Sequence, residues 1–187
     1  MYGQIVASLG FLSNGEVILA GASTLTGDVV GSAATKVNKL LDSSKGKVLV
    51  IDEAYILAKS VYGLEALDTL VERVQGGVGE DFAVILCGYE EEMRTMMREC
   101  NPGLSRRFRT EDAFIFNDYS DEQLAVILVE RAREMELHMN HELATYVVRN
   151  VLSKQKAKPH FGNVGAVNNI LEHGKVSNYY CNMKYAS

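Results

Sequence analysis

The sequence has no apolar run that approaches the ~18 residues of a membrane-spanning helix, and no signal peptide stands at its start. Cysteine is scarce: only Cys87, Cys100 and Cys181 occur, without a CxxC pair or zinc-type spacing. We therefore expect reduced thiols in an intracellular compartment, most simply the cytoplasm. The net charge of -5 gives no general attraction for nucleic acid or an anionic membrane, so we expect neither as a partner.

The composition is typical of a globular protein, with 47% hydrophobic and 23% charged residues. The length of 187 residues is enough for one domain with a small appendage. Apolar runs alternate with helical patterns through the first part of the chain. This alternation predicts an α/β fold with a parallel sheet. The expected strands are Glu16–Ala20, Val48–Ile51, Phe82–Cys87 and Ala113–Phe116, and the expected helices are Met1–Leu12, Ala33–Leu41, Gly63–Val74 with Leu64 on its buried face, and Glu90–Arg98.

From Asp118 onward only helical patterns occur, so we divide the chain into an α/β part, residues 1–117, and a helical part, residues 118–187. Ser120 and Gln123 fit a capping box, and Asn140 and Asn163 are expected to cap two further helices. The expected buried faces are Leu124, Ile127, Leu128, Ala132 and Met135 in the first helix, Leu143, Tyr146, Val147 and Val151 in the second, and Val164, Val167, Ile170 and Leu171 in the third.

The strongest chemical signal is the strand Val48–Ile51, which runs straight into Asp52 and Glu53. An unbroken apolar run suits a strand that is buried on both faces, and the carboxylates then emerge at its carboxyl end, where open α/β sheets bind ligands. Two carboxylates there call for a nearby cation, such as a metal ion. The alternative is a solvated acidic pair.

A second signal is the segment 101–109, in which Asn101, Pro102 and Gly103 precede three arginines. Proline and glycine predict a rigid turn that presents the arginines. The guanidinium group is always charged and binds phosphate in a bidentate manner, so this cluster suits stabilisation of a phosphate. The alternative is a solvated basic loop.

Taken together and in order, these motifs resemble those of the AAA+ ATPases related to stage V sporulation protein K and the red-type Rubisco activase. The resemblance extends from Met1 to about Leu171 and is carried by Ile51–Tyr55, Tyr62–Leu67, Ala83–Tyr89, Asn101–Leu104 and Phe161–Asn163. It implies a P-loop NTPase-type α/β core followed by a small helical lid. It also implies ATP hydrolysis with Mg²⁺, assembly into a ring that is usually a hexamer, and remodelling of a protein substrate.

By position, the resemblance makes Asp52 and Glu53 the Walker B pair. Asp52 would hold Mg²⁺ through water, and Glu53 would orient the attacking water. Tyr89 falls at the sensor-1 position, where a polar residue contacts the nucleotide. Gly162 and Asn163 belong to the motif of the lid that binds the nucleotide cofactor in this family.

The arginine finger of the family usually reads Asn-Pro-Gly-Leu/Phe-Arg-Ser-Arg, whereas this chain has Leu104-Ser105-Arg106-Arg107. Arg107 keeps the last position, and Arg106 is a substitute for the displaced arginine. Either is expected to reach the γ-phosphate in the site of a neighbouring subunit.

Three departures from the family pattern concern function. The chain contains no GxxxxGK[ST], the loop that cradles the phosphates, and the strand that precedes this loop in the family is missing as well. Val29 stands in the pore-loop region where an aromatic residue is usual. Gly165 stands at the sensor-2 position, where the family has an arginine.

Two interpretations follow. The first is a fragment of an AAA+ ATPase that is catalytically inert by itself. The second is a non-hydrolysing AAA+-like subunit that scaffolds a ring and offers an arginine finger to an active neighbour. Under either interpretation, the missing central strand leaves two strands with unpaired edges, and we expect poor solubility of the isolated chain.

Overall fold

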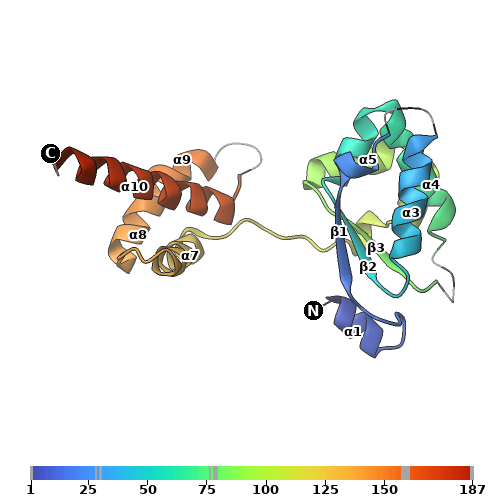
Figure 1. Cartoon of the computed structure of the whole chain (residues 1–187), viewed down its shortest axis with the longest axis horizontal. Coiled ribbons are helices and arrows are strands. Elements are labelled where there is room, and N and C mark those ends of the chain that lie inside the picture. Colours follow the sequence, from blue (N-terminus) through green and yellow to red (C-terminus); the bar gives the residue numbers. More distant parts are fainter. Residues whose placement is uncertain are drawn as a thin grey trace. The chain divides into compact units, whose positions relative to one another are not determined.

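The computed structural model describes residues 2–27, 29, 31–75, 77, 80–156 and 161–185, with side chains as far as residue 174. The chain divides into two compact units, Met1–Ile115 and Phe116–Ser187 (Figure 1). No helix in the described ranges is long and apolar enough to cross a bilayer.

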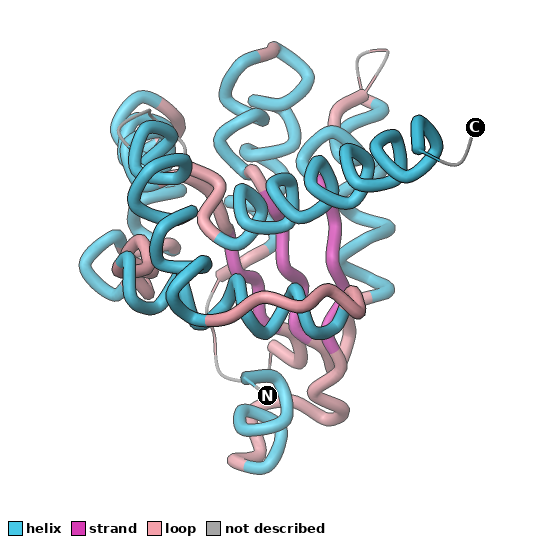
Figure 2. Tube along the Cα trace, turned by 90° about the vertical axis from the view of Figure 1, so that its left-hand side faces the viewer, coloured by secondary structure: helices cyan, strands magenta, loops and turns pink. Residues whose placement is uncertain are grey.

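The first unit is built on a parallel sheet of three strands in the order β1-β2-β3, as expected for an α/β fold (Figure 2). The strands are β1 (Val17–Gly21), β2 (Val48–Asp52) and β3 (Ala83–Leu86). Gly21 pairs with Asp52 and Ile51 pairs with Leu86. Because β2 lies between two partners and is rich in branched residues, Leu49 and Ile51 are fully buried.

Helices complete this unit around the sheet. Their bounds are α1 (Tyr2–Ser8), α2 (Ala22–Leu25), α3 (Ser32–Ser43), the 3₁₀ helix η1 (Ala54–Lys59), α4 (Val61–Arg73), α5 (Glu90–Glu99), α6 (Pro102–Arg107) and the 3₁₀ helix η2 (Thr110–Asp112). Leucines of α3, β2, η1, α4 and α6 form one core with Ile51 and Met96, namely Leu41, Leu49, Leu57, Leu67, Leu70 and Leu104.

The second unit is built from helices joined by short non-helical segments in its described residues. It contains α7 (Asp121–Glu134), α8 (His141–Val147), the π-helical stretch η3 (Val148–Leu152), α9 (Ser153–Lys156) and α10 (Val164–Tyr185). The capping box of α7 is confirmed, since Ser120 Oγ accepts from Gln123 N and Ser120 N donates to Gln123 Oε1. Asn140 caps α8 as expected, because its side chain accepts from Leu143 N at 2.8 Å.

The expected strand Ala113–Phe116 is wrong. The segment makes no ladder with any described strand, and Phe114, Ile115 and Phe116 are 74, 59 and 92% exposed. A strand persists only where a neighbour receives its main-chain hydrogen bonds, and these residues have no such neighbour. They form the connection at the boundary between the two units.

Four details of the first unit also differ from expectation. Helix α1 ends at Ser8 rather than Leu12, and α4 starts at Val61, where Ser60 Oγ accepts from Gly63 N at 3.0 Å. Leu64 is 40% exposed, because the core-facing residues of α4 are Gly63, Ala66, Leu67 and Leu70. The segment 101–103 does not form a turn that halts a helix; it starts the new helix α6.

In the second unit the expected buried face of α8 is wrong at three of its four residues, while Val147 is partly buried and packs against the core. Leu143, Tyr146 and Val151 are 48, 65 and 43% exposed. The buried residues are instead Ala144, Val148 and Leu152, spaced by four. This spacing is that of one face of a helix, and the row continues through the π-helical turn Val148–Leu152.

Candidate functional site

The candidate site lies at the carboxyl end of β2. The strand is buried, but Asp52 and Glu53 emerge exposed where it ends. Main-chain bonds hold this point firmly, because Ile51 O accepts from Cys87 N and Cys87 O accepts from Ala54 N, both at 2.9 Å. The carboxylates are therefore presented by a rigid element at the edge where parallel sheets bind ligands.

Glu53 has an unusual backbone, with φ 51° and ψ 40°. Placing a residue with a Cβ in this left-handed region raises the free energy of the folded state by about 1–3 kcal/mol, and such strain is typical of functional sites. The conformation turns the chain from β2 directly into η1, and Glu53 N donates to Asp52 Oδ1 at 2.9 Å. The Asp52 carboxylate is thus held by the main chain of the residue that follows it.

Tyr55 orients the second carboxylate. Its hydroxyl donates to Glu53 Oε1 at 3.1 Å, and its ring is 9% exposed beneath Lys59 Nζ, which lies 4.9 Å from the ring centre. Burial, then the bond to Glu53 and its charge, raise the pKa of Tyr55, so the hydroxyl keeps its proton for this bond at neutral pH. Sequence reasoning gave Tyr55 no role, although it stands within the motif Ile51–Tyr55.

Tyr89, the residue at the sensor-1 position, joins the same group. It follows β3 at the start of α5, and its ring centre lies 6.1 Å from that of Tyr55. Cys87 lies close by: burial raises the pKa of its thiol, and the negative charge of Asp52 raises it further. The structure therefore brings Asp52, Glu53 and Tyr89 to one edge of the sheet.

This group can hold a metal ion only with help from a ligand. The described residues contain no set of three or more His, Cys, Asp or Glu side chains arranged for a metal. Mg²⁺, however, keeps several waters and is held in nucleotide sites by one or two carboxylates plus phosphate oxygens. A single exposed Asp52 at the strand end fits that role and does not fit a metal site made only of protein ligands.

Arg106 and Arg107 lie on α6, Arg109 follows it as the cap of η2, and none of them is part of this group. Asn101 caps α6 through a bond from Gly103 N at 2.8 Å. Arg107 is bound to its own chain, because its Nε donates to Val74 O and its Nη1 to Gly103 O. Arg109 pairs with Asp112 at 3.3 Å. Arg106 is exposed and makes no hydrogen bond or ion pair with the residues that the structure describes.

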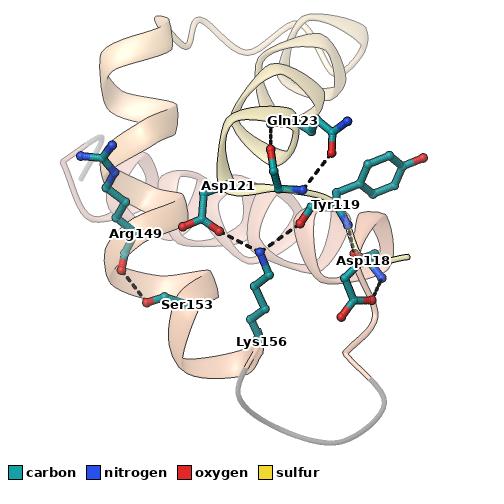
Figure 3. A network of polar contacts seen from close by, with 9 residues as sticks. Asp118, Tyr119, Asp121, Gln123, Arg149, Ser153 and Lys156 are labelled. Carbon is teal, nitrogen blue, oxygen red and sulfur yellow. Dashed lines mark hydrogen bonds and ion pairs between the residues drawn. The ribbon is translucent and has the colours of Figure 1, made fainter. Parts of the chain in front are cut away.

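Gly162 and Asn163 lie in the second unit, at the start of α10. Asn163 adopts φ 46°, and its side chain accepts from Tyr119 N at 3.1 Å and donates to Asp118 Oδ1 at 2.7 Å. Lys156 fixes the same stretch, donating to Tyr119 O and Asp121 Oδ1 at 3.0 Å (Figure 3). Asn163 therefore ties the start of this unit to α10 and does not cap that helix with its side chain. Binding of a nucleotide by Gly162 and Asn163 stays a prediction.

No family model matches the chain. It is 33% identical over 177 residues to a CfxQ homolog of Trieres chinensis, covering 92% of this chain and 59% of that protein. It is 32% identical to the plasmid CbxX protein of Cupriavidus necator, over 92% of this chain and 54% of that one. It is also 32% identical to the chloroplastic ribulose bisphosphate carboxylase/oxygenase activase of Cyanidioschyzon merolae, over 93% and 56%.

The chain thus spans between half and three fifths of the length of these relatives. Among solved structures, a mutant of RuvB from Thermotoga maritima aligns with a TM-score of 0.45 and 18% identity, over 83% of this chain and 53% of that chain.

Proposed function

Because the chain belongs to the family of the CbxX and CfxQ proteins and of Rubisco activase, which are AAA+ ATPases, we propose that it carries the magnesium and water part of an ATP-hydrolysis site. The observation that carries the proposal is the carboxylate pair at the end of the buried central strand, with Glu53 held in a left-handed conformation. Asp52 holds Mg²⁺ through water, and Glu53 orients the water that attacks the γ-phosphate.

The other half of such a site cradles the phosphates, and it needs a GxxxxGK[ST] loop that this sequence does not contain. We therefore propose that this chain by itself is catalytically inert. When ATP and Mg²⁺ are bound, the metal neutralises charge on the transferred phosphoryl group. Tyr89 and, from the helical unit, Gly162 and Asn163 are the proposed nucleotide contacts of this chain.

The proposed assembly is a ring of AAA+ subunits, six by family, that remodels a protein substrate in the cytoplasm. In such a ring an arginine of α6 stabilises the γ-phosphate in the site of the neighbouring subunit. Val29, 64% exposed, stands at the proposed pore-loop position. A valine there offers a smaller apolar contact to a substrate chain than an aromatic residue does.

A second candidate is a non-hydrolysing ring subunit that scaffolds and supplies an arginine to an active neighbour. Gly165 favours it, because a glycine cannot contact a phosphate through a side chain and no atom lies within 4 Å of a Cβ added at this position. The two candidates differ in one respect: only the first requires an intact phosphate-binding loop in the whole protein.

The test starts with a fluorescent ATP analogue titrated into this chain with and without Mg²⁺. We expect neither tight binding nor turnover. If the chain shows Mg²⁺-dependent turnover and Glu53→Gln abolishes it, the proposal that the chain is inert is refuted. The coding sequence upstream of Met1 is then read for an in-frame GxxxxGK[ST]. If the motif is present, the longer protein should hydrolyse ATP, with loss in Glu53→Gln and no loss in the matched control Glu130→Gln, an exposed residue of α7.

If the motif is degraded or absent, the result supports the second candidate, a non-hydrolysing subunit that scaffolds the ring. Absence of hydrolysis by a longer protein with an intact motif refutes the ATPase proposal.

A further inference from the structure

A groove opens on the first unit between η1, the start of α4 and one side of α5. Its volume is about 540 Å³. Ala58 and Lys59 line it from η1, Leu64 lines it from α4, and Thr95 and Cys100 are among the residues that line it from α5 and the residue after α5. Ligand pockets in proteins typically enclose about 300–1,000 Å³, so this groove is large enough to receive several side chains of a partner.

Part of the groove is apolar. Met96 of α5 lies in its wall and is buried, with 2% exposure, whereas Leu64 of α4 is 40% exposed. Val61 stands one turn before Leu64 and is 77% exposed. Because residues three positions apart lie on the same face of a helix, α4 exposes two apolar side chains on the face that borders the groove.

The charged residues of the groove are mostly acidic. Among the described residues, those that line it are Glu91, Glu92 and Glu99 of α5 and Lys59 of η1. Arg98 lies 3.4 Å from Glu99, but the two side chains are 70 and 65% exposed, and an ion pair in water at such exposure is weak. The groove therefore carries a net negative charge.

Two side chains within the groove sense this charge. Burial raises the pKa of the Cys100 thiol, and the charges of Glu99 and Asp68 raise it further. Burial is also the main cause of the raised pKa of Tyr55, to which the charge of Glu92 adds. A surface with this potential repels phosphate groups and acidic chains and attracts cations.

We propose that this groove binds a basic, amphipathic segment of a protein partner, whose apolar side chains cover Leu64 and Met96 while flanking arginines or lysines face the glutamates of α5. Exposed carboxylates alone hold a small cation weakly in water. A protein segment fits better, because it also covers the apolar wall and excludes water from the charge pairs, which strengthens them. This inference goes beyond the proposed function and does not depend on ATP hydrolysis.

The groove adjoins the candidate site through Tyr55. This residue lines the groove, and its hydroxyl donates to Glu53 Oε1 at 3.1 Å. Lys59 Nζ lies over the same ring, 4.9 Å from its centre. A segment bound in the groove therefore lies against the side chain that orients Glu53.

The first experiment measures whether a basic segment covers the groove. This chain, at micromolar concentration, is mixed with synthetic amphipathic peptides that carry leucines on one face and arginines on both sides of them. Alkylation by iodoacetamide is followed by mass spectrometry at Cys100, which lines the groove, and at Cys87, which does not. Because a covered thiol is not reached, we expect saturating peptide to slow alkylation of Cys100 about tenfold and to leave Cys87 unchanged. If none of the peptides protects Cys100, the proposal is overturned.

The second experiment compares variants by the fluorescence anisotropy of a labelled peptide. Leu64→Ala should weaken binding about tenfold, and so should Glu91→Lys combined with Glu99→Lys. The matched control is Glu130→Lys combined with Glu134→Lys, two exposed residues of α7 that give the same change in net charge and should leave the affinity unchanged.

The peptide is varied as well, with glutamates in place of its arginines or serines in place of its leucines, and each change should weaken binding about tenfold. If the serine peptide or the polycation spermine binds as tightly as the original peptide, the surface attracts any cation and the proposal is overturned. Equal losses in the α5 and α7 double variants lead to the same conclusion.

Discussion

Replacement of Gly63 by alanine tests how tightly α4 is packed onto η1, the 3₁₀ helix that carries Tyr55. Gly63 is buried in the first turn of α4, and an added Cβ would lie 2.0 Å from Leu57 O and 2.7 Å from Leu57 C and Cα. These are backbone atoms that cannot rotate away. Ordinary contact begins at 3.4 Å, so α4 and η1 must separate by more than 1 Å.

The expected free energy change follows from two opposing effects. Alanine is favoured over glycine within a helix by up to about 1 kcal/mol. Overpacking of a filled core costs about 1–3 kcal/mol, and a clash with backbone belongs at the upper end. We therefore expect Gly63→Ala to lower the free energy of unfolding of the first unit by about 2 kcal/mol.

Gly165→Ala is the matched control, because Gly165 also lies in the first turn of a helix and no atom lies within 4 Å of an added Cβ. It should leave its unit unchanged or stabilise it by up to about 1 kcal/mol. Native-state hydrogen exchange measures each change in its own unit, from amides of α3 and α4 and from amides of α7 and α8. If Gly63→Ala leaves the free energy of unfolding of its unit unchanged or raises it, as expected for Gly165→Ala, the close packing of α4 on η1 is refuted.

Three further predictions concern other contacts. Asn163→Gly keeps the left-handed backbone but loses the bonds to residues 118 and 119, and should destabilise the helical unit by about 1–2 kcal/mol in urea unfolding; Asn163→Ala should cost about 1 kcal/mol more because of its Cβ at φ 46°. Equal losses would contradict this. Bonds from the Ser13 hydroxyl and N–H lower the pKa of Asp81 from its usual 3.8, so this carboxylate stabilises the fold above pH 3.8 and the contribution disappears as the pH falls through the lowered pKa. Asp81→Asn should weaken the fall of Tm with decreasing pH below pH 4. If the fall of Tm is unchanged, other groups cause it. The isolated chain should self-associate through its unpaired edges and exposed apolar residues, and Phe114→Lys with Phe116→Lys should reduce this association in sedimentation velocity, whereas a cooperative, reversible melt of an unaltered monomer would count against it.

The elements that the sequence predicted correctly are those whose signals are local. The branched run of β2 predicts a buried strand because both of its faces pack. The capping box at Ser120 and the cap at Asn140 depend on residues three positions apart. The carboxylates at the end of β2 were predictable for the same reason, since a strand end and its next two residues are adjacent in sequence.

The contacts that the sequence could not predict join groups without a periodic pattern. Nothing in the order of residues shows that Arg107 donates to the carbonyl of Val74, because every residue has the same main-chain carbonyl oxygen, whatever its side chain. The bond from Tyr55 to Glu53 depends on the left-handed backbone of Glu53, which a glutamate rarely adopts. Local propensity therefore favours the wrong conformation at the residue on which the proposed chemistry depends.

The segment Ala113–Phe116 shows the limit from the other direction. Its apolar residues have the composition of a strand, and in the structure they are exposed and unpaired. β-propensity expresses packing on a pleated surface and bonding to neighbours, so a strand-like sequence becomes a strand only when a partner lies beside it. Among the described strands, β3 pairs with β2 alone, which leaves its other edge without a described partner. If a further strand bound that edge, it could offer its own free side to Ala113–Phe116, and this segment would then have the partner that its composition requires.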